Sequence, residues 1–257
     1  MPILSIEQAQ HFILIFLRVS AMIVLMPIIG DRVVPARIKG GLAVLVAFVI
    51  FPSVPADPQV LSFDFITLFF KMISEIMIGA ILGFTVRLIF SAVELAGQLV
   101  GFQMGLAVAN VIDPDSSSQV SIVAQFQYII AVLLYLSMNG HHALFLGMAD
   151  SFKVLPLPGG FQMSGPLYEA VMASIKDMFS IALKIGAPII AVLLFMSVGL
   201  GLVARTVPQI NIFIVAIPLQ IAVGLITTGL SMPIIASVVG RCFGDIENCV
   251  HHLLRLM

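Results

Sequence analysis

Six long apolar stretches dominate the chain and limit what it can fold into. They run over residues 12–29, 41–54, 65–90, 120–138, 179–203 and 212–239. Several exceed the about 20 residues with which a helix crosses the hydrocarbon core of a bilayer. The second stretch is short and ends at Pro52 and Pro55, so it fits a full span or one arm of a hairpin equally well. We therefore predict an all-α, polytopic membrane protein with about six hydrophobic segments.

Composition supports this fold class and excludes others. The 257 residues are 60% hydrophobic and 10% charged, whereas an ordinary globular chain is about a quarter charged. Lipid or partner subunits must cover so much apolar surface. The 12 basic and 13 acidic residues are scattered singly, so nothing resembles the basic stripe of a nucleic-acid-binding protein. Residues 1–10 carry no basic residue, and we expect no cleaved signal peptide.

One segment between the apolar stretches cannot be helical. Residues 155–166 are rich in proline and glycine, with Pro156, Pro158, Gly159, Gly160, Gly165 and Pro166. We predict a loop that divides the helices of a single domain, residues 1–257, into two halves.

The charged residues of the connections do not follow a simple alternation of basic inside and acidic outside, because the connection with Asp113 and Asp115 should be cytoplasmic yet is acidic.

Glycines recur at helical spacing in the third stretch and its extension. Gly97, Gly101 and Gly105 follow one another every four residues, and Gly79 with Gly83 repeats the spacing. Such a face lets two helix backbones approach closely. Packing within the chain and tight packing between subunits explain it equally well.

A polar island separates two apolar stretches. It contains Asn110, Asp113, Pro114, Asp115, Ser116, Ser117, Ser118 and Gln119. The Asp113-Pro114 pair should end the preceding helix. At membrane depth irregular backbone persists only when it is buried in protein or lines a wet cavity, so the island is an exposed connection or part of a pore constriction. On its residues alone we favour the connection.

Ionisable residues interrupt the apolar stretches and their extensions. They are Lys71, Glu75, Arg87, Glu94, Lys176, Asp177 and Lys184. A proton or ion relay would explain them, and so would mutual neutralisation at a protein interface or a helix partly outside the bilayer. We favour neutralisation, because Lys71 and Glu75 lie one helical turn apart and can pair.

The later part of the chain contains a predicted hairpin tip. Pro208, Gln209 and Asn211 separate two apolar stretches, and Pro188 and Pro218 should bend the helices on either side.

Metal binding and catalysis find little support. Cys242, Cys249, His251 and His252 cluster near the C-terminus, on a probable helix without a loop to surround an ion, so we predict no metal site. The sequence has no phosphate-binding glycine loop, His-Glu-x-x-His motif or Gly-x-Ser-x-Gly elbow. We predict no enzyme activity and no cofactor.

Four segments together resemble the FliR family, which is related to the SctT-type proteins of injectisomes. They are Pro35 to Lys39, Ala96 to Gly105 running into Asp113-Pro114, Asn139-Gly-His141, and Pro208 to Phe213 followed by Pro218. The resemblance covers essentially the whole chain and implies bent helical hairpins in a subunit of the flagellar type III export gate. Such a subunit assembles with FliP and FliQ, beside FlhB and FlhA, in the inner membrane at the flagellar basal body. Unfolded flagellar proteins pass through this gate, much of which lies on the periplasmic side.

The resemblance also assigns a role to the polar island. In the FliR family the loop that matches Leu106 to Gln119 projects into the pore and helps to plug it. This implication reverses the preference for a plain connection that the residues alone suggest.

Other functions remain open at this point. A small secondary transporter would use bent helices and charges near Glu75 and Lys184 as a substrate site, but it should show two related halves. A purely structural membrane scaffold is compatible with the glycine faces. The region from Gly97 to Gly105 favours the flagellar over the injectisome branch.

Overall fold

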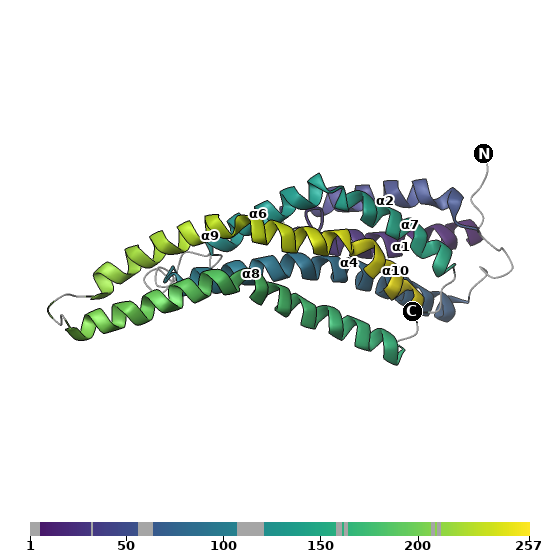
Figure 1. Cartoon of the computed structure of the whole chain (residues 1–257). Coiled ribbons are helices and arrows are strands. Elements are labelled where there is room, and N and C mark those ends of the chain that lie inside the picture. The colour runs from purple at the N-terminus through teal and green to yellow at the C-terminus, as the bar shows by residue number, and fades with distance from the viewer. Residues whose placement is uncertain are drawn as a thin grey trace. The chain divides into compact units, whose positions relative to one another are not determined.

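The computed structural model describes residues 6–31, 33–55, 64–106, 121–157, 161, 164–206, 209 and 212–257, and these residues contain helices but no β-strand (Figure 1). The helices are α1 (Ile6–Leu25), α2 (Ala36–Ile50), η1 (Phe51–Ser53), α4 (Phe65–Gln103), α6 (Ile122–Ser137), α7 (Gly140–Val154), α8 (Gly165–Thr206), α9 (Ile212–Gly244) and α10 (Ile246–Leu256). Among the described residues, five spans are long and apolar enough to cross a membrane, and α6 with α7 makes a sixth if they count as one broken span. The predicted all-α membrane fold is confirmed.

The chain forms two compact units. The first comprises residues 1–88, 139–175 and 244–257, and the second comprises residues 89–138 and 176–243. The long helices α4 and α8 contribute residues to both units. That the chain is one domain stays a prediction.

In the first unit α1 packs against α2 and α4. The buried residues of α2 are Ala43 and Ala47, whose spacing of four places them on one face toward α1. Their small side chains let the two helices lie close together. Helix α4 runs parallel to α1, since Gly79 lies beside Arg18 and Gly83 lies beside Met22. In the same unit α10 packs on α7, where Gly147 meets Val250.

A strained turn joins α1 to α2. The Ile29 N–H donates to the Pro27 carbonyl at 2.9 Å across Ile28, whose φ is 71°. A positive φ is rare for a β-branched residue. The Lys39 ammonium donates to the Gly30 carbonyl in this turn at 2.9 Å. The segment from Pro35 to Lys39 thus stabilises the turn that precedes it.

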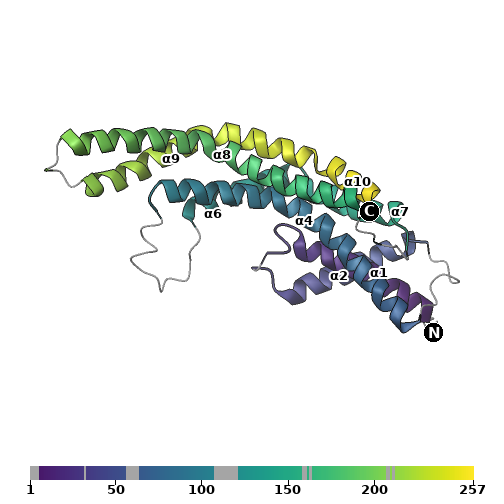
Figure 2. The ribbon, with the colours of Figure 1, turned by 90° about the horizontal axis from the view of Figure 1, so that it is seen from below.

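The second unit consists of the later part of α4, α6, and most of α8 with α9. Figures 1 and 2 show α8 and α9 running side by side up to their connection at residues 207–211. The Gln220 amide on α9 donates to the Ser197 hydroxyl on α8 at 3.1 Å. Pro188 lies inside α8, and Pro218 lies inside α9. The apolar core between α4, α6 and α8 contains Val100, Met104, Val123, Ile189 and Leu193.

Two connections agree with the sequence pattern. Asn139, between α6 and α7, adopts the left-handed conformation with φ 55° and ψ 29°, which asparagine tolerates better than most residues. The proline- and glycine-rich segment separates α7, which ends at Val154, from α8, which begins at Gly165. The predicted loop over residues 155–166 is therefore two residues too long, because Gly165 and Pro166 form the start of α8, where a helix tolerates proline. Helix α7 itself was not among the six predicted stretches.

Candidate functional site: a buried charge cluster and the end of α4

A buried ion pair joins α1 to α4 in the first unit. The Arg18 Nε lies 2.5 Å from Glu75 Oε2, and the two side chains are 1% and 0% exposed. Charges this deeply buried persist only when partners compensate for their lost hydration. The pair thus links α1 to α4 through two buried charges.

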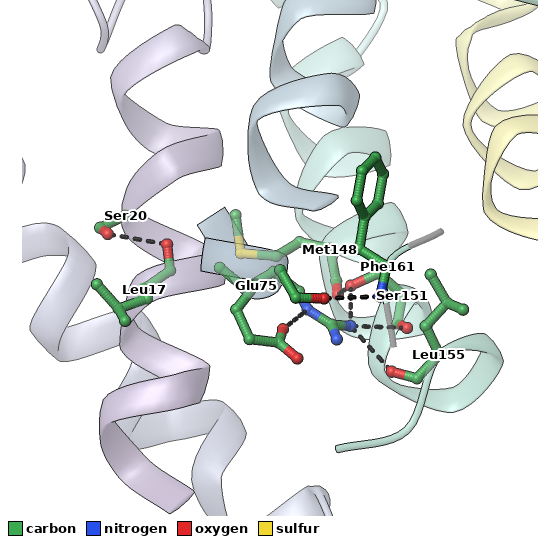
Figure 3. A network of polar contacts seen from close by, with 9 residues as sticks. Leu17, Ser20, Glu75, Met148, Ser151, Leu155 and Phe161 are labelled. Atoms are coloured by element: carbon green, nitrogen blue, oxygen red, sulfur yellow. Dashed lines mark hydrogen bonds and ion pairs between the residues drawn. The ribbon is translucent and has the colours of Figure 1, made fainter. Parts of the chain in front are cut away.

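The same guanidinium reaches the end of α7. Its Nη1 donates to the Ser151 carbonyl at 3.0 Å, the Ser151 hydroxyl at 3.3 Å and the Leu155 carbonyl at 3.1 Å. In Figure 3 the Glu75 carboxylate and the last turn of α7, with Ser151 and Leu155, turn toward one another. Helix C-termini carry partial negative charge, which favours a cation at this position. The centroid of the Phe152 ring lies 4.3 Å from Arg18 Cζ. We call Arg18, Glu75, Ser151, Phe152 and Leu155 the Arg18 cluster.

The chemistry of the Arg18 cluster favours neutralisation over a proton relay. Arginine does not release its proton in proteins, and its partners here are a carboxylate, a hydroxyl, two carbonyls and an aromatic ring. The arrangement fixes α1, α4 and α7 at one point. Sequence reasoning missed Arg18, although it is the one charged residue in the stretch 12–29. The pairing of Lys71 with Glu75 stays a prediction.

Hydrogen bonds also fix the connection between α7 and α8. The Phe161 N–H donates to the hydroxyl of Ser74, the neighbour of Glu75, at 2.7 Å. The Ser164 hydroxyl donates to the Leu256 carbonyl of α10 at 2.9 Å and accepts from the Leu167 N–H at 3.2 Å, which caps the start of α8. The connection is therefore bonded to α4 at one point and to α10 at another.

Gly79, Gly83 and Gly97 of the predicted glycine faces contact helices of the same chain, whereas Gly105 lies beyond the end of α4 and is not on its face. A Cβ at Gly79 would overlap the Arg18 carbonyl oxygen, and a Cβ at Gly83 would lie 2.9 Å from the Met22 carbonyl oxygen. In the second unit a Cβ at Gly97 would overlap the backbone of Ala124 in α6. These contacts show close helix packing within the chain.

Helix α4 ends in a cap that requires glycine. Gly105 has φ 81°; its N–H donates to the Phe102 carbonyl at 3.0 Å, and the Leu106 N–H donates to the Gly101 carbonyl at 3.2 Å. This pair of bonds is the Schellman motif. Leu106 packs against the core that contains Val100 and Met104.

The cap yields a prediction for Gly105. We expect Gly105→Ala to lower the free energy of unfolding by about 1–2 kcal/mol, because an L-residue is disfavoured at this φ. Gly105→Asn should cost less, since asparagine tolerates the left-handed region. Thermal unfolding of the purified chain, followed by circular dichroism, measures both. Equal stability of wild type and Gly105→Ala would contradict the cap.

Among the other predicted charges, Lys71 is half-buried. Glu94 is half-buried, and the exposed ones are Arg87, Lys176, Asp177 and Lys184. Gln209 at the predicted hairpin tip is also exposed. Outside the described residues lie Pro208 and Asn211 and the whole polar island, with Asn110, Asp113, Pro114, Asp115, Ser116, Ser117, Ser118 and Gln119.

The C-terminal cysteines lie on two helices rather than one. Cys242 is in α9 and Cys249 is in α10, with a break at Asp245. His251 lies near Asp150 of α7, with 3.8 Å between Nε2 and Oδ2. Within the part of the chain that the structure describes, no three His, Cys, Asp or Glu side chains are placed to hold a metal ion.

Comparison with known proteins decides the family. A family model described as "Bacterial export proteins, family 1" matches residues 9–246. The flagellar biosynthetic protein FliR of Bacillus subtilis (strain 168) is 37% identical over 255 residues, which are 98% of this chain and 97% of that protein. The chain belongs to the FliR family. FliR of Escherichia coli (strain K12) is also 37% identical, over 93% of this chain and 90% of its own length.

More distant members agree. FliR of Aquifex aeolicus (strain VF5) is 29% identical over 95% of this chain and 93% of its own length. The resemblance to FliR is thereby confirmed, and with it a role in flagellar biosynthesis and bacterial export for a membrane protein. The names of the FliR relatives describe flagellar biosynthesis rather than a chemical reaction.

Proposed function

We propose that this FliR-family chain is a subunit of the flagellar type III protein export gate. With FliP and FliQ, and beside FlhA and FlhB, it forms the channel through which unfolded flagellar proteins cross the bacterial inner membrane. The observation that carries the proposal is the exposed apolar surface of α8, which is too long for a bilayer to cover.

Exposed apolar side chains extend along α8 from Tyr168 to Val203. This distance is ~53 Å of helix at 1.5 Å per residue, whereas the hydrocarbon core is about 30 Å thick. Partner subunits are the natural cover for the remainder.

A charged residue within this surface strengthens the argument. Lys184 is exposed between the exposed apolar residues Leu183 and Val192. If lipid covered the middle of α8, it would surround an ammonium group, which is costly. If lipid covered only one end, apolar side chains of the other end would lie outside the membrane. Both placements call for a protein partner and disfavour a self-sufficient transporter.

A substitution next to Lys184 tests the partner surface. Leu183 is 59% exposed, and we expect Leu183→Asp to reduce the FliP and FliQ that copurify with the chain by about tenfold or more, because an unpaired charge would be buried in the interface. Lys184→Gln, on the neighbouring residue, is the matched control and should keep copurification near wild type. Equal yields for the two variants would contradict the proposal.

Residues Leu106 to Gln119 are proposed to line and obstruct the resting pore. The support is the polar sequence between two apolar helices and the likeness to FliR proteins. Deletion of residues 113–118 should raise ion leakage through the resting gate and alter export of flagellar proteins. Leakage is measured in cells or in proteoliposomes with the assembled complex. Unchanged leakage and unchanged export would refute this role.

A further inference from the structure

Both ends of the segment 107–120 meet at one residue, Gly101. Before the segment, the Leu106 N–H donates to the Gly101 carbonyl at 3.2 Å. After it, Ser121 lies against Gly101 so closely that a Cβ there would overlap the Ser121 hydroxyl oxygen. We call Gly101, Gly105, Leu106 and Ser121 the loop base. Because Leu106 and Val123 also pack in one apolar core, the two ends of the segment have a common support.

Helix α9 contacts this support at a glycine. A Cβ at Gly224 would lie 2.5 Å from Met104 Cε and 2.7 Å from Met104 Cγ. Met104 immediately precedes Gly105 and is 0% exposed, so its side chain would have to shift within the packed core to admit that Cβ. The absence of a side chain at position 224 therefore allows the end of α4 to lie against α9.

A polar contact lies one turn earlier on α9. A Cβ at Gly105 would lie 3.6 Å from Gln220 Oε1, and the Gln220 Nε2 donates to the Ser197 hydroxyl of α8 at 3.1 Å. Gln220 thus spans from the loop base to α8. The hydrogen bond to Ser197 fixes the orientation of its amide.

We propose that Gln220 and Gly224 are positioning residues that hold the loop base against α8 and α9. They fix the positions of Leu106 and Ser121, the residues that flank the segment 107–120. A displacement of α9 at this contact therefore displaces both flanking residues together. Gly224 acts through Met104, and Gln220 links the base to Ser197. The inference rests on the proposed role of residues 106–119 in the pore.

Thiol labelling of the assembled complex tests the inference. The chain carries Cys242→Ala and Cys249→Ala, with a reporter at Ser117→Cys, and is isolated in complex with FliP and FliQ before a maleimide is added. We expect Gly224→Ala to change the labelling rate of this reporter by about fivefold or more, the factor that corresponds to about 1 kcal/mol of overpacking. A second reporter, Gln209→Cys in place of Ser117→Cys, should label at an unchanged rate.

Matched variants separate positioning from general damage. Gly229→Ala lies on the same helix, where a Cβ would meet nothing within 4 Å, and it should leave the labelling rate unchanged. In the double variant Gly224→Ala with Met104→Ala, the effect should be smaller than the product of the two single effects, because Met104→Ala removes the atoms that the new Cβ meets. Gln220→Leu should change the rate by about threefold through loss of one hydrogen bond.

The possible outcomes distinguish the two proposals. If the wild-type chain forms no complex with FliP and FliQ, the proposed function fails, and the inference fails with it. If the complex forms and Gly224→Ala labels like Gly229→Ala, the inference alone is overturned. Should Gly224→Ala prevent assembly, Gln220→Leu decides, because it removes no packed glycine contact; a rate equal to wild type then overturns the inference.

Discussion

Replacing Arg18 by methionine is expected to lower the free energy of unfolding by about 3–5 kcal/mol, because it removes the guanidinium that neutralises a buried carboxylate. Glu75 is 0% exposed and lies 2.5 Å from the guanidinium. Arg18→Met also removes the donor to the Ser151 and Leu155 carbonyls at the end of α7. Thermal or denaturant unfolding in detergent, followed by circular dichroism, measures the loss.

Two controls show whether the effect belongs to the buried pair. The double variant Arg18→Met with Glu75→Met should recover much of the stability, since no charge is then buried. Asp150→Asn removes the exposed pair with Lys153, whose Nζ lies 2.7 Å from Asp150 Oδ1, together with the 3.8 Å contact to His251, and should cost at most about 1 kcal/mol. A loss for Arg18→Met as small as that for Asp150→Asn would contradict the structural role of the Arg18 cluster.

A methyl group at Gly79 is expected to destabilise the chain by about 3 kcal/mol, because the contact is with rigid backbone rather than with a movable side chain. A Cβ there would overlap the Arg18 carbonyl oxygen. Gly79→Ala must therefore separate α1 from α4 close to the Arg18–Glu75 contact. The same unfolding experiment measures the change.

Gly199→Ala in α8 is the matched control for Gly79→Ala. A Cβ at Gly199 would meet nothing within 4 Å, and alanine has the higher helix propensity, so this variant should be neutral or stabilising by up to about 1 kcal/mol. Similar stability for Gly79→Ala and Gly199→Ala would show that the helices are not held as closely as the structure has them.

The sequence predicts the helices well where apolar residues are continuous. The stretches 12–29 and 212–239 correspond to α1 and α9. Helix α7 is missed, because residues 140–154 combine an apolar face with His141, Asp150 and Lys153 and form no continuous apolar run. Periodicity at 3.6 residues, rather than hydropathy alone, is the signal that could have found it.

Long-range contacts explain most of what the sequence did not predict. Glu75 is conspicuous in an apolar stretch, but Arg18 lies 57 residues earlier in the chain. The glycine spacing predicts close approach without saying which helix approaches: Gly79 lies against α1 and Gly97 against α6. The left-handed cap at Gly105 could have been inferred from a glycine that ends a helical pattern.

The most direct test of the proposed function is the mass of the particle that the chain forms. The chain is expressed with and without FliP and FliQ of the same bacterium, purified in detergent and examined by native mass spectrometry. We expect a stable mixed assembly that contains all three proteins, and poor recovery of the chain alone, since the apolar surface of α8 lacks its cover. A stable monomer or homodimer that excludes FliP and FliQ would contradict the export-gate account.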